Sequence, residues 1–167
     1  MDLLKLSTDW AKAEVFSAKI IALISIVILL GSLGFFIYGK TAMARAFVWP
    51  LFAAGLFMIA VSAGLYFANK PRIAQFEAAY QQNATQFAEA EIARTAKSQQ
   101  DFTKVFIVLP LLIVAGAALI LFLSSPTWRA IGISLAFLST VLLLIDSNTE
   151  ARNAAYHKQL KTITHGR

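Results

Sequence analysis

The hydropathy pattern is dominated by four long, mostly apolar runs. They cover residues 20–38, 46–68, 105–123 and 128–145, and the last contains one base, Arg129, at its edge. A bilayer core of about 30 Å is crossed by about 20 apolar residues in a helix. The runs are continuous and do not alternate, which excludes barrel strands. The pattern therefore predicts an all-α polytopic membrane protein with four transmembrane helices.

The first run has a second interpretation as a cleaved signal peptide, because Ala42-Met43-Ala44 resembles a cleavage site. Its apolar core is longer than the usual 7–15 residues, and the leader that precedes it contains three acids, Asp2, Asp9 and Glu14. These features favour an uncleaved transmembrane helix.

The segment 71–103 connects the second and third runs and has the composition of a helix, with eight alanines, six glutamines and no glycine. Both of its ends meet the same membrane face, so a single straight helix that projects outward is excluded. Asn83 and Gln86 resemble a capping pair. We therefore expect a helical hairpin that turns at Gln82-Asn83, and a helix along the membrane surface is the alternative.

The two termini also have helical character. We expect terminal helices over residues 8–19, starting at Thr8-Asp9, and over residues 147–163. Together with the hairpin 71–103 they would form a soluble bundle beneath the membrane. An equally favoured alternative places the first eighteen residues in the membrane interface as an amphipathic helix.

The basic residues are distributed unevenly between the two sides of the predicted membrane domain. Three precede the first run, five lie between the second and third, and four follow the fourth, which places twelve on one side. The other side has three: Lys40, Arg45 and Arg129. Because positive flanks stay inside, both termini and the hairpin are predicted to be cytoplasmic, most simply at a bacterial inner membrane.

Composition supports a membrane protein and argues against a nucleic-acid partner. Hydrophobic residues make up 58% of the 167 residues and charged residues 14%, against about 25% charged in soluble domains. The net charge of +6 arises largely from bases that set the orientation. There is no cysteine, which excludes disulfides and thiolate chemistry.

No catalytic, cofactor-binding or metal-binding set is recognisable in the sequence. The four apolar runs contain no buried ionisable side chain, which argues against proton- or ion-coupled transport. The two histidines, His157 and His165, are eight residues apart, which is not a helical ligand spacing, and both are expected to be solvated. We therefore predict neither a cofactor nor a metal.

Two sets of small residues recur every four positions and allow helices to approach closely. They are Ala60, Gly64 and Ala68 in the second run, and Gly132, Ala136 and Thr140 in the fourth. Each set is a candidate subunit interface, although packing within one chain explains it more simply.

A ring of polar residues is predicted at the cytoplasmic membrane boundary. Its members are Lys19, Asn69, Lys70, Lys104 and Asp146. The ring is a candidate ion vestibule or a site for lipid headgroups or other anions. Ordinary anchoring of lysines in the interface explains it more simply, and Asp146 is expected to pair with one of the lysines.

Three functions remain open at this level. The favoured one is a non-catalytic membrane protein that binds another membrane protein or itself, as an accessory subunit or an immunity-type partner. The alternative is a homo-oligomeric channel, pore or small transporter lined by Ser25, Ser32, Ser62 or Thr140. A lipid-modifying membrane enzyme is the third and weakest hypothesis, because no base is paired with a nucleophile.

Overall fold

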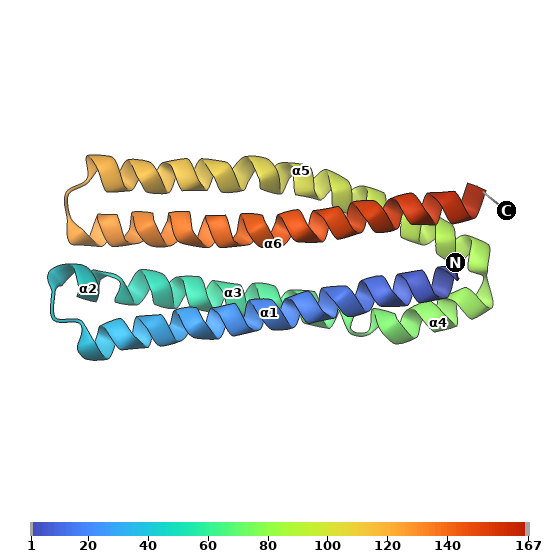
Figure 1. Cartoon of the computed structure of the whole chain (residues 1–167), viewed down its shortest axis with the longest axis horizontal. Helices are drawn as coiled ribbons and strands as arrows, with labels where there is room; N and C mark the ends of the chain where they lie inside the picture. Colours follow the sequence, from blue (N-terminus) through green and yellow to red (C-terminus); the bar gives the residue numbers. More distant parts are fainter. Residues whose placement is uncertain (1, 166–167) are drawn as a thin grey trace.

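The computed structural model describes residues 2–165, and these residues form six helices joined by short connections. The helices are α1 (Leu3–Tyr38), α2 (Ala42–Ala46), α3 (Val48–Asn69), α4 (Arg72–Gln82), α5 (Ala84–Phe122) and α6 (Pro126–His165). Both ends of the chain lie at the same end of the molecule as α4 (Figure 1). We call residues 2–19, 70–104 and 146–165 the polar end, and residues 20–69 and 105–145 the apolar half.

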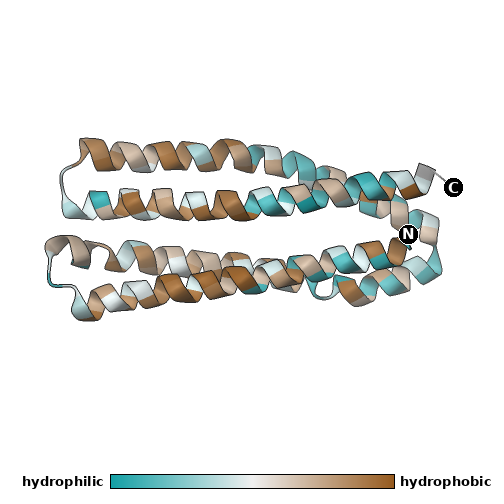
Figure 2. Ribbon diagram, viewed as in Figure 1, coloured by the Kyte–Doolittle hydropathy of each residue, from teal (hydrophilic) through white to brown (hydrophobic). Residues whose placement is uncertain are grey.

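The apolar half has the surface of a protein that contacts lipid. Four helical stretches are long and apolar enough to cross a membrane. Large apolar side chains are exposed along them, including Phe122 at 82%, and hydrophobic ribbon covers most of this half (Figure 2). A water-soluble protein rarely exposes so much contiguous apolar surface. The all-helical class and the four candidate spans are therefore as the sequence predicts.

Helix α1 is uninterrupted and runs through both the polar end and the apolar half. Its 36 residues extend about 54 Å, longer than the membrane core of about 30 Å. The helix start predicted at Thr8-Asp9 is wrong. Asp2 caps the helix by accepting from Leu4 N, and the Thr8 hydroxyl instead donates to the Leu4 carbonyl inside the first turns.

The buried face of α1 follows a heptad repeat. Alternating steps of four and three residues connect eight of its ten buried positions, which are Ser7, Ala11, Glu14, Ala18, Ile21, Ser25, Ile28 and Ser32. This spacing keeps one side of a helix facing its partner along its whole length. The same stripe therefore packs α1 in the polar end and in the apolar half.

The second predicted span divides into two helices. Thr41 caps α2 by accepting from Ala44 N, and the helix is interrupted at Phe47 before α3 begins. Pro50 lacks the N–H that would donate to the Ala46 carbonyl, so a regular helix cannot pass through this point with all its bonds. Helix α3, which covers most of the predicted span 46–68, accordingly begins at Val48.

The apolar half consists of two helical hairpins, because α1 packs mainly on α3 and α5 mainly on α6. In the first hairpin the Ser62 hydroxyl donates to the Ala18 carbonyl and the Ser32 hydroxyl to the Val48 carbonyl, each at 2.8 Å. In the second, Gly116 and Gly132 bring two backbones together: a Cβ added to either would lie 2.6 Å from the other's carbonyl oxygen. Contacts of α3 and α1 with α6 join the hairpins.

The polar end is a bundle with its own apolar core. The chain turns at Asn83, whose side chain accepts from Thr85 N and Gln86 N, as the capping pair predicts. Side chains from four helices meet there: Leu3, Ala11, Phe76, Phe87, Ala88, Tyr156 and Leu160. The start of α1 is part of this core. The expectation of a bundle therefore fits, and that of a separate interfacial helix does not.

Candidate functional site

Tyr156 is the centre of a buried polar network in the polar end. Its side chain is 3% exposed, and its hydroxyl lies 2.7 Å from Ser7 Oγ and 2.9 Å from Glu91 Oε2. A phenol carries one proton, which it can donate to Ser7 Oγ or to the Glu91 carboxylate, because the Ser7 hydroxyl itself donates to the Leu3 carbonyl. Burial, reinforced by the Glu91 charge, raises the pKa of Tyr156. The phenol therefore stays protonated and joins α6 to α1 and α5.

The Glu91 carboxylate is neutralised by an arginine on its own helix. Arg94 donates through Nε to Oε1 at 2.9 Å and through Nη2 to Oε2 at 2.7 Å. The guanidinium lies 4.1 Å from the centre of the Trp10 ring, and the same indole stacks on Tyr156 with their ring centres 5.3 Å apart. Glu91, Arg94, Trp10 and Tyr156 thus form a compact stack in which every charge is matched.

A second buried ion pair connects the two ends of the chain. Glu14 of α1 accepts from Arg152 Nε at 3.1 Å and from Arg152 Nη2 at 3.0 Å. Burial raises the pKa of Glu14, and the charge of Arg152 opposes this rise. The two residues are 138 positions apart in the sequence. The pair therefore joins α1 to α6 within the polar end.

The expectation that both histidines are solvated is wrong for His157. Its Nδ1 lies 2.6 Å from the hydroxyl of Thr95, which is fully buried on α5. Burial and the neighbouring Lys161 lower the pKa of His157, which favours the neutral ring. Beside it, Asn153 donates to the Thr95 carbonyl at 3.1 Å. The side chain of His165 lies outside the described residues.

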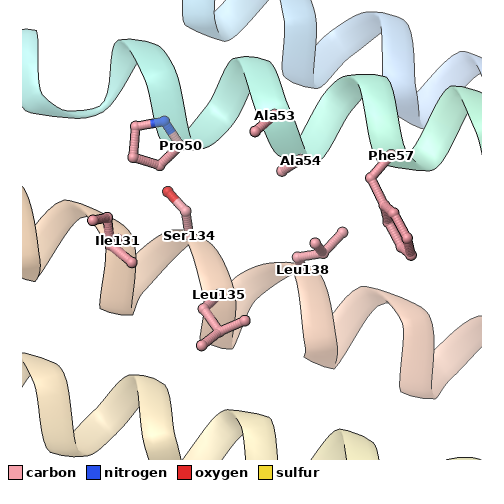
Figure 3. Close-up of a pocket in the computed structure, with 8 residues that line it drawn as sticks. All are labelled: Pro50, Ala53, Ala54, Phe57, Ile131, Ser134, Leu135 and Leu138. Carbon is pink, nitrogen blue, oxygen red and sulfur yellow. The ribbon is translucent and has the colours of Figure 1, made fainter.

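The apolar half contains a cavity of about 310 Å³ between α3 and α6. Figure 3 shows the Ser134 side chain pointing from α6 toward Pro50 of α3, among apolar neighbours. The Ser134 hydroxyl is buried and has no hydrogen-bond partner among the described residues. No histidine, lysine or carboxylate lines the cavity, so a nucleophilic serine would have no base to activate it.

In the described part of the chain, no hydrogen bond or ion pair joins two members of the predicted polar ring. Lys19, Lys70 and Lys104 are exposed, and Lys104 pairs with Asp101 at 3.4 Å. Asn69 is buried, donates to the Leu65 carbonyl and accepts from Arg72. Asp146 takes part in none of the ion pairs formed by the described residues, so the expected pairing with a lysine is absent.

The two small-residue sets have different environments. Gly132 and Ala136 meet α5 at Gly116, which is packing within one chain, whereas Thr140 is exposed and donates to the Ala136 carbonyl. The α3 set is entirely exposed, and a Cβ at Gly64 would meet nothing within 4 Å. We call Ala60, Gly64 and Ala68 the α3 stripe.

The network around Tyr156 was not anticipated from the sequence, although a signal for it is present. Ser7, Ala11 and Glu14 continue the heptad positions of the first span into the leader. An acid on such a stripe is expected to have a basic partner, since a buried charge is retained only when it is paired.

No protein-family model, curated protein or solved structure matches the chain. In the part of the chain that the structure describes, no three histidine, aspartate or glutamate side chains are grouped so that they could hold a metal ion. What the chain does is therefore inferred from the geometry of its own residues.

Proposed function

We propose that the chain is a non-catalytic integral membrane protein that acts by binding another membrane protein, with both termini and the α4–α5 turn in the cytoplasm. The observation that carries the proposal is the hydrogen bonding of the polar groups in the apolar half. The hydroxyls of Ser25, Ser32, Ser62 and Thr140 donate to backbone carbonyls within the chain, which leaves an outer surface suited to lipid and to other apolar helices.

The same observation disfavours the channel hypothesis. Ser25, Ser32 and Ser62 are buried, and each donates to a carbonyl within α1, or between α1 and α3. These hydroxyls therefore do not lie on a face that could line a path between protomers. Of the four candidates only Thr140 is exposed, and its proton is donated to Ala136 O.

An enzymatic function has less support. Glu14 and Glu91 are held by Arg152 and Arg94 in buried pairs, so neither carboxylate is free to accept a proton from a substrate. The buried Ser134 hydroxyl has no base among its neighbours in the cavity. These groups have the properties of structural residues.

The proposed orientation predicts a labelling pattern for single cysteines in intact cells. Cysteine at Thr41 or Thr127 should react with a membrane-impermeant maleimide, because Thr41 lies in the connection before α2, Thr127 lies exposed in the first turn of α6, and few bases flank either position. Cysteine at Gln82, beside the α4–α5 turn, should be protected until the membrane is permeabilised. Labelling of Gln82→Cys in intact cells would contradict the orientation.

The binding function predicts a complex of fixed stoichiometry after purification in mild detergent. Gly64→Leu fills the open space of the α3 stripe, so we expect it to release the bound protein while the chain stays folded. Ala115→Leu, at an equally small and exposed site on α5, is the matched control and should leave the complex intact. The measurement is the mass and protein composition of the purified particle in each variant.

Ion flux in liposomes decides between this function and the channel. We expect no flux from the purified chain. A stable homo-oligomer whose flux changes in Ser62→Leu or Thr140→Val would contradict the binding function. A particle whose mass is the same in both leucine variants would show that the α3 stripe is not the binding surface.

A further inference from the structure

A second cavity of about 310 Å³ lies where the apolar half meets the polar end. It opens between the end of α3 and the start of α4 on one side and α5 on the other. Residues of α1 and α6, including Trp10 and Asn153, also line it.

The cavity lining is graded from apolar to basic. Leu65, Ala68 and Phe102 line the part nearest the predicted membrane core. Arg72, Arg94 and Lys97 line the part within the polar end, together with the carboxylates of Glu14 and Asp101. The order follows from the two helices, because α3 leads into the polar end while α5 leads out of it. The cavity therefore presents an apolar wall and a basic wall at the depth of the headgroups.

The positive charge of the cavity exceeds the negative charge that could neutralise it. Arg94 is paired with Glu91, Glu14 with Arg152, and Asp101 with Lys104. In the described part of the chain, neither Arg72 nor Lys97 forms an ion pair. Burial and the charge of Arg94 lower the pKa of Arg72, so a bound anion would relieve a repulsion that the protein leaves in place.

Two further polar atoms at the cavity lack a partner. Trp10 Nε1, a donor, and Asn153 Oδ1, an acceptor, are both buried without a hydrogen bond to any described residue, and both residues line the cavity. Asn153 is 1% exposed. Leaving such groups unpaired is unfavourable, so a ligand that offers both an acceptor and a donor would be stabilised here.

We propose that this cavity binds the headgroup of an anionic phospholipid from the inner leaflet. The phosphate lies against Arg72 and Lys97, since guanidinium and ammonium groups are the usual partners of phosphate oxygens. A phosphate or glycerol oxygen accepts from Trp10 Nε1, and a headgroup hydroxyl donates to Asn153 Oδ1. The acyl chains follow Leu65, Ala68 and Phe102 into the bilayer.

The test measures lipid binding to the purified full-length chain, delipidated in a neutral detergent. Phosphatidylglycerol is titrated and bound lipid is counted by native mass spectrometry. Phosphatidylcholine tests the need for net negative charge, and soluble glycerol phosphate tests the need for acyl chains. We expect saturable binding of phosphatidylglycerol, with the other two probes at least about tenfold weaker.

Two double variants with the same change in net charge separate the cavity from the general surface. Arg72→Gln with Lys97→Gln should weaken phosphatidylglycerol binding at least about tenfold. Lys19→Gln with Lys70→Gln removes two exposed lysines at the same boundary and should change it less than about twofold. Equal weakening of phosphatidylglycerol binding in both double variants would contradict the cavity as the binding site. If glycerol phosphate binds as tightly as phosphatidylglycerol, the ligand of the cavity is a soluble phosphate ester.

Trp10 provides a readout that leaves the cavity residues unchanged. Trp49 and Trp128 are both exposed, so replacing them with phenylalanine leaves Trp10 as the single indole. Phosphatidylglycerol should shift the Trp10 emission in a saturable way, and phosphatidylcholine should not. An emission that does not respond to phosphatidylglycerol would overturn the proposal even if Arg72→Gln fails to fold.

Discussion

A Glu91→Ala variant is expected to lose about 3–5 kcal/mol of unfolding free energy, near the lower figure. The change leaves the Arg94 guanidinium without its bidentate partner and removes the acceptor of the Tyr156 hydroxyl. Removing one member of a buried pair is costly because the other charge stays desolvated. The Arg94 side chain is 24% exposed, so water recovers part of the loss. Thermal or denaturant unfolding in detergent measures the effect.

Glu89→Ala is the matched control, because Glu89 lies two residues away on α5 and is exposed. We expect it to change the unfolding free energy by no more than about 0.5 kcal/mol. Adding Arg94→Ala to Glu91→Ala should recover part of the stability, since no unpaired charge then remains. Equal losses in the Glu91 and Glu89 variants would show that the pair contributes nothing to folding.

A Gly116→Val variant is expected to separate α5 from α6. A Cβ at this position would lie 2.6 Å from the Gly132 carbonyl oxygen and 3.1 Å from Ala136 N. Both are backbone atoms, so no side-chain rotation can relieve the clash, and the helices must move apart. Overpacking typically costs 1–3 kcal/mol, and here we expect about 3 kcal/mol, measured as a lower unfolding temperature.

Gly64→Val is the control for the general effect of replacing a glycine in an apolar helix. Its new side chain would meet no atom of the chain, so we expect no measurable loss of stability in detergent. Gly116→Ala should fall between the two, because a methyl group already makes the contact with Gly132 O. A loss at Gly64 as large as that at Gly116 would contradict the close approach.

The main elements of this fold follow from local physical rules. Long apolar runs must become helices to bond their own backbone in lipid, and Asn83 with Gln86 specifies a turn because its amide oxygen caps the next helix. The interruption of the helix at Phe47, between α2 and α3, does not follow from the hydropathy pattern. It depends on a single missing N–H at Pro50, which hydropathy does not register.

The polar network depends on pairings that a single sequence does not encode locally. Glu14 and Arg152 are 138 positions apart. The local sequence around either residue does not identify the other as its partner. The sequence pattern drew attention to Asp146, Lys70 and Lys104 because they border the apolar runs, yet the two lysines are exposed and none of the three belongs to the buried network. Buried polar residues in a helical bundle are better sought on the heptad stripe itself.

The way the network is connected sets an order for biogenesis. The first hairpin, α1 with α3, makes its hydrogen bonds within residues 18–62 and can assemble as soon as those residues have left the ribosome. Ser7 and Glu14 must wait much longer, because their partners Tyr156 and Arg152 belong to the last helix. A chain halted before Arg152 would therefore carry an unpaired acid and an uncovered Trp10 at the membrane surface. In such a product the start of α1 lacks the partners that cover it in the finished chain, so it opens locally more readily and is more accessible to proteolysis.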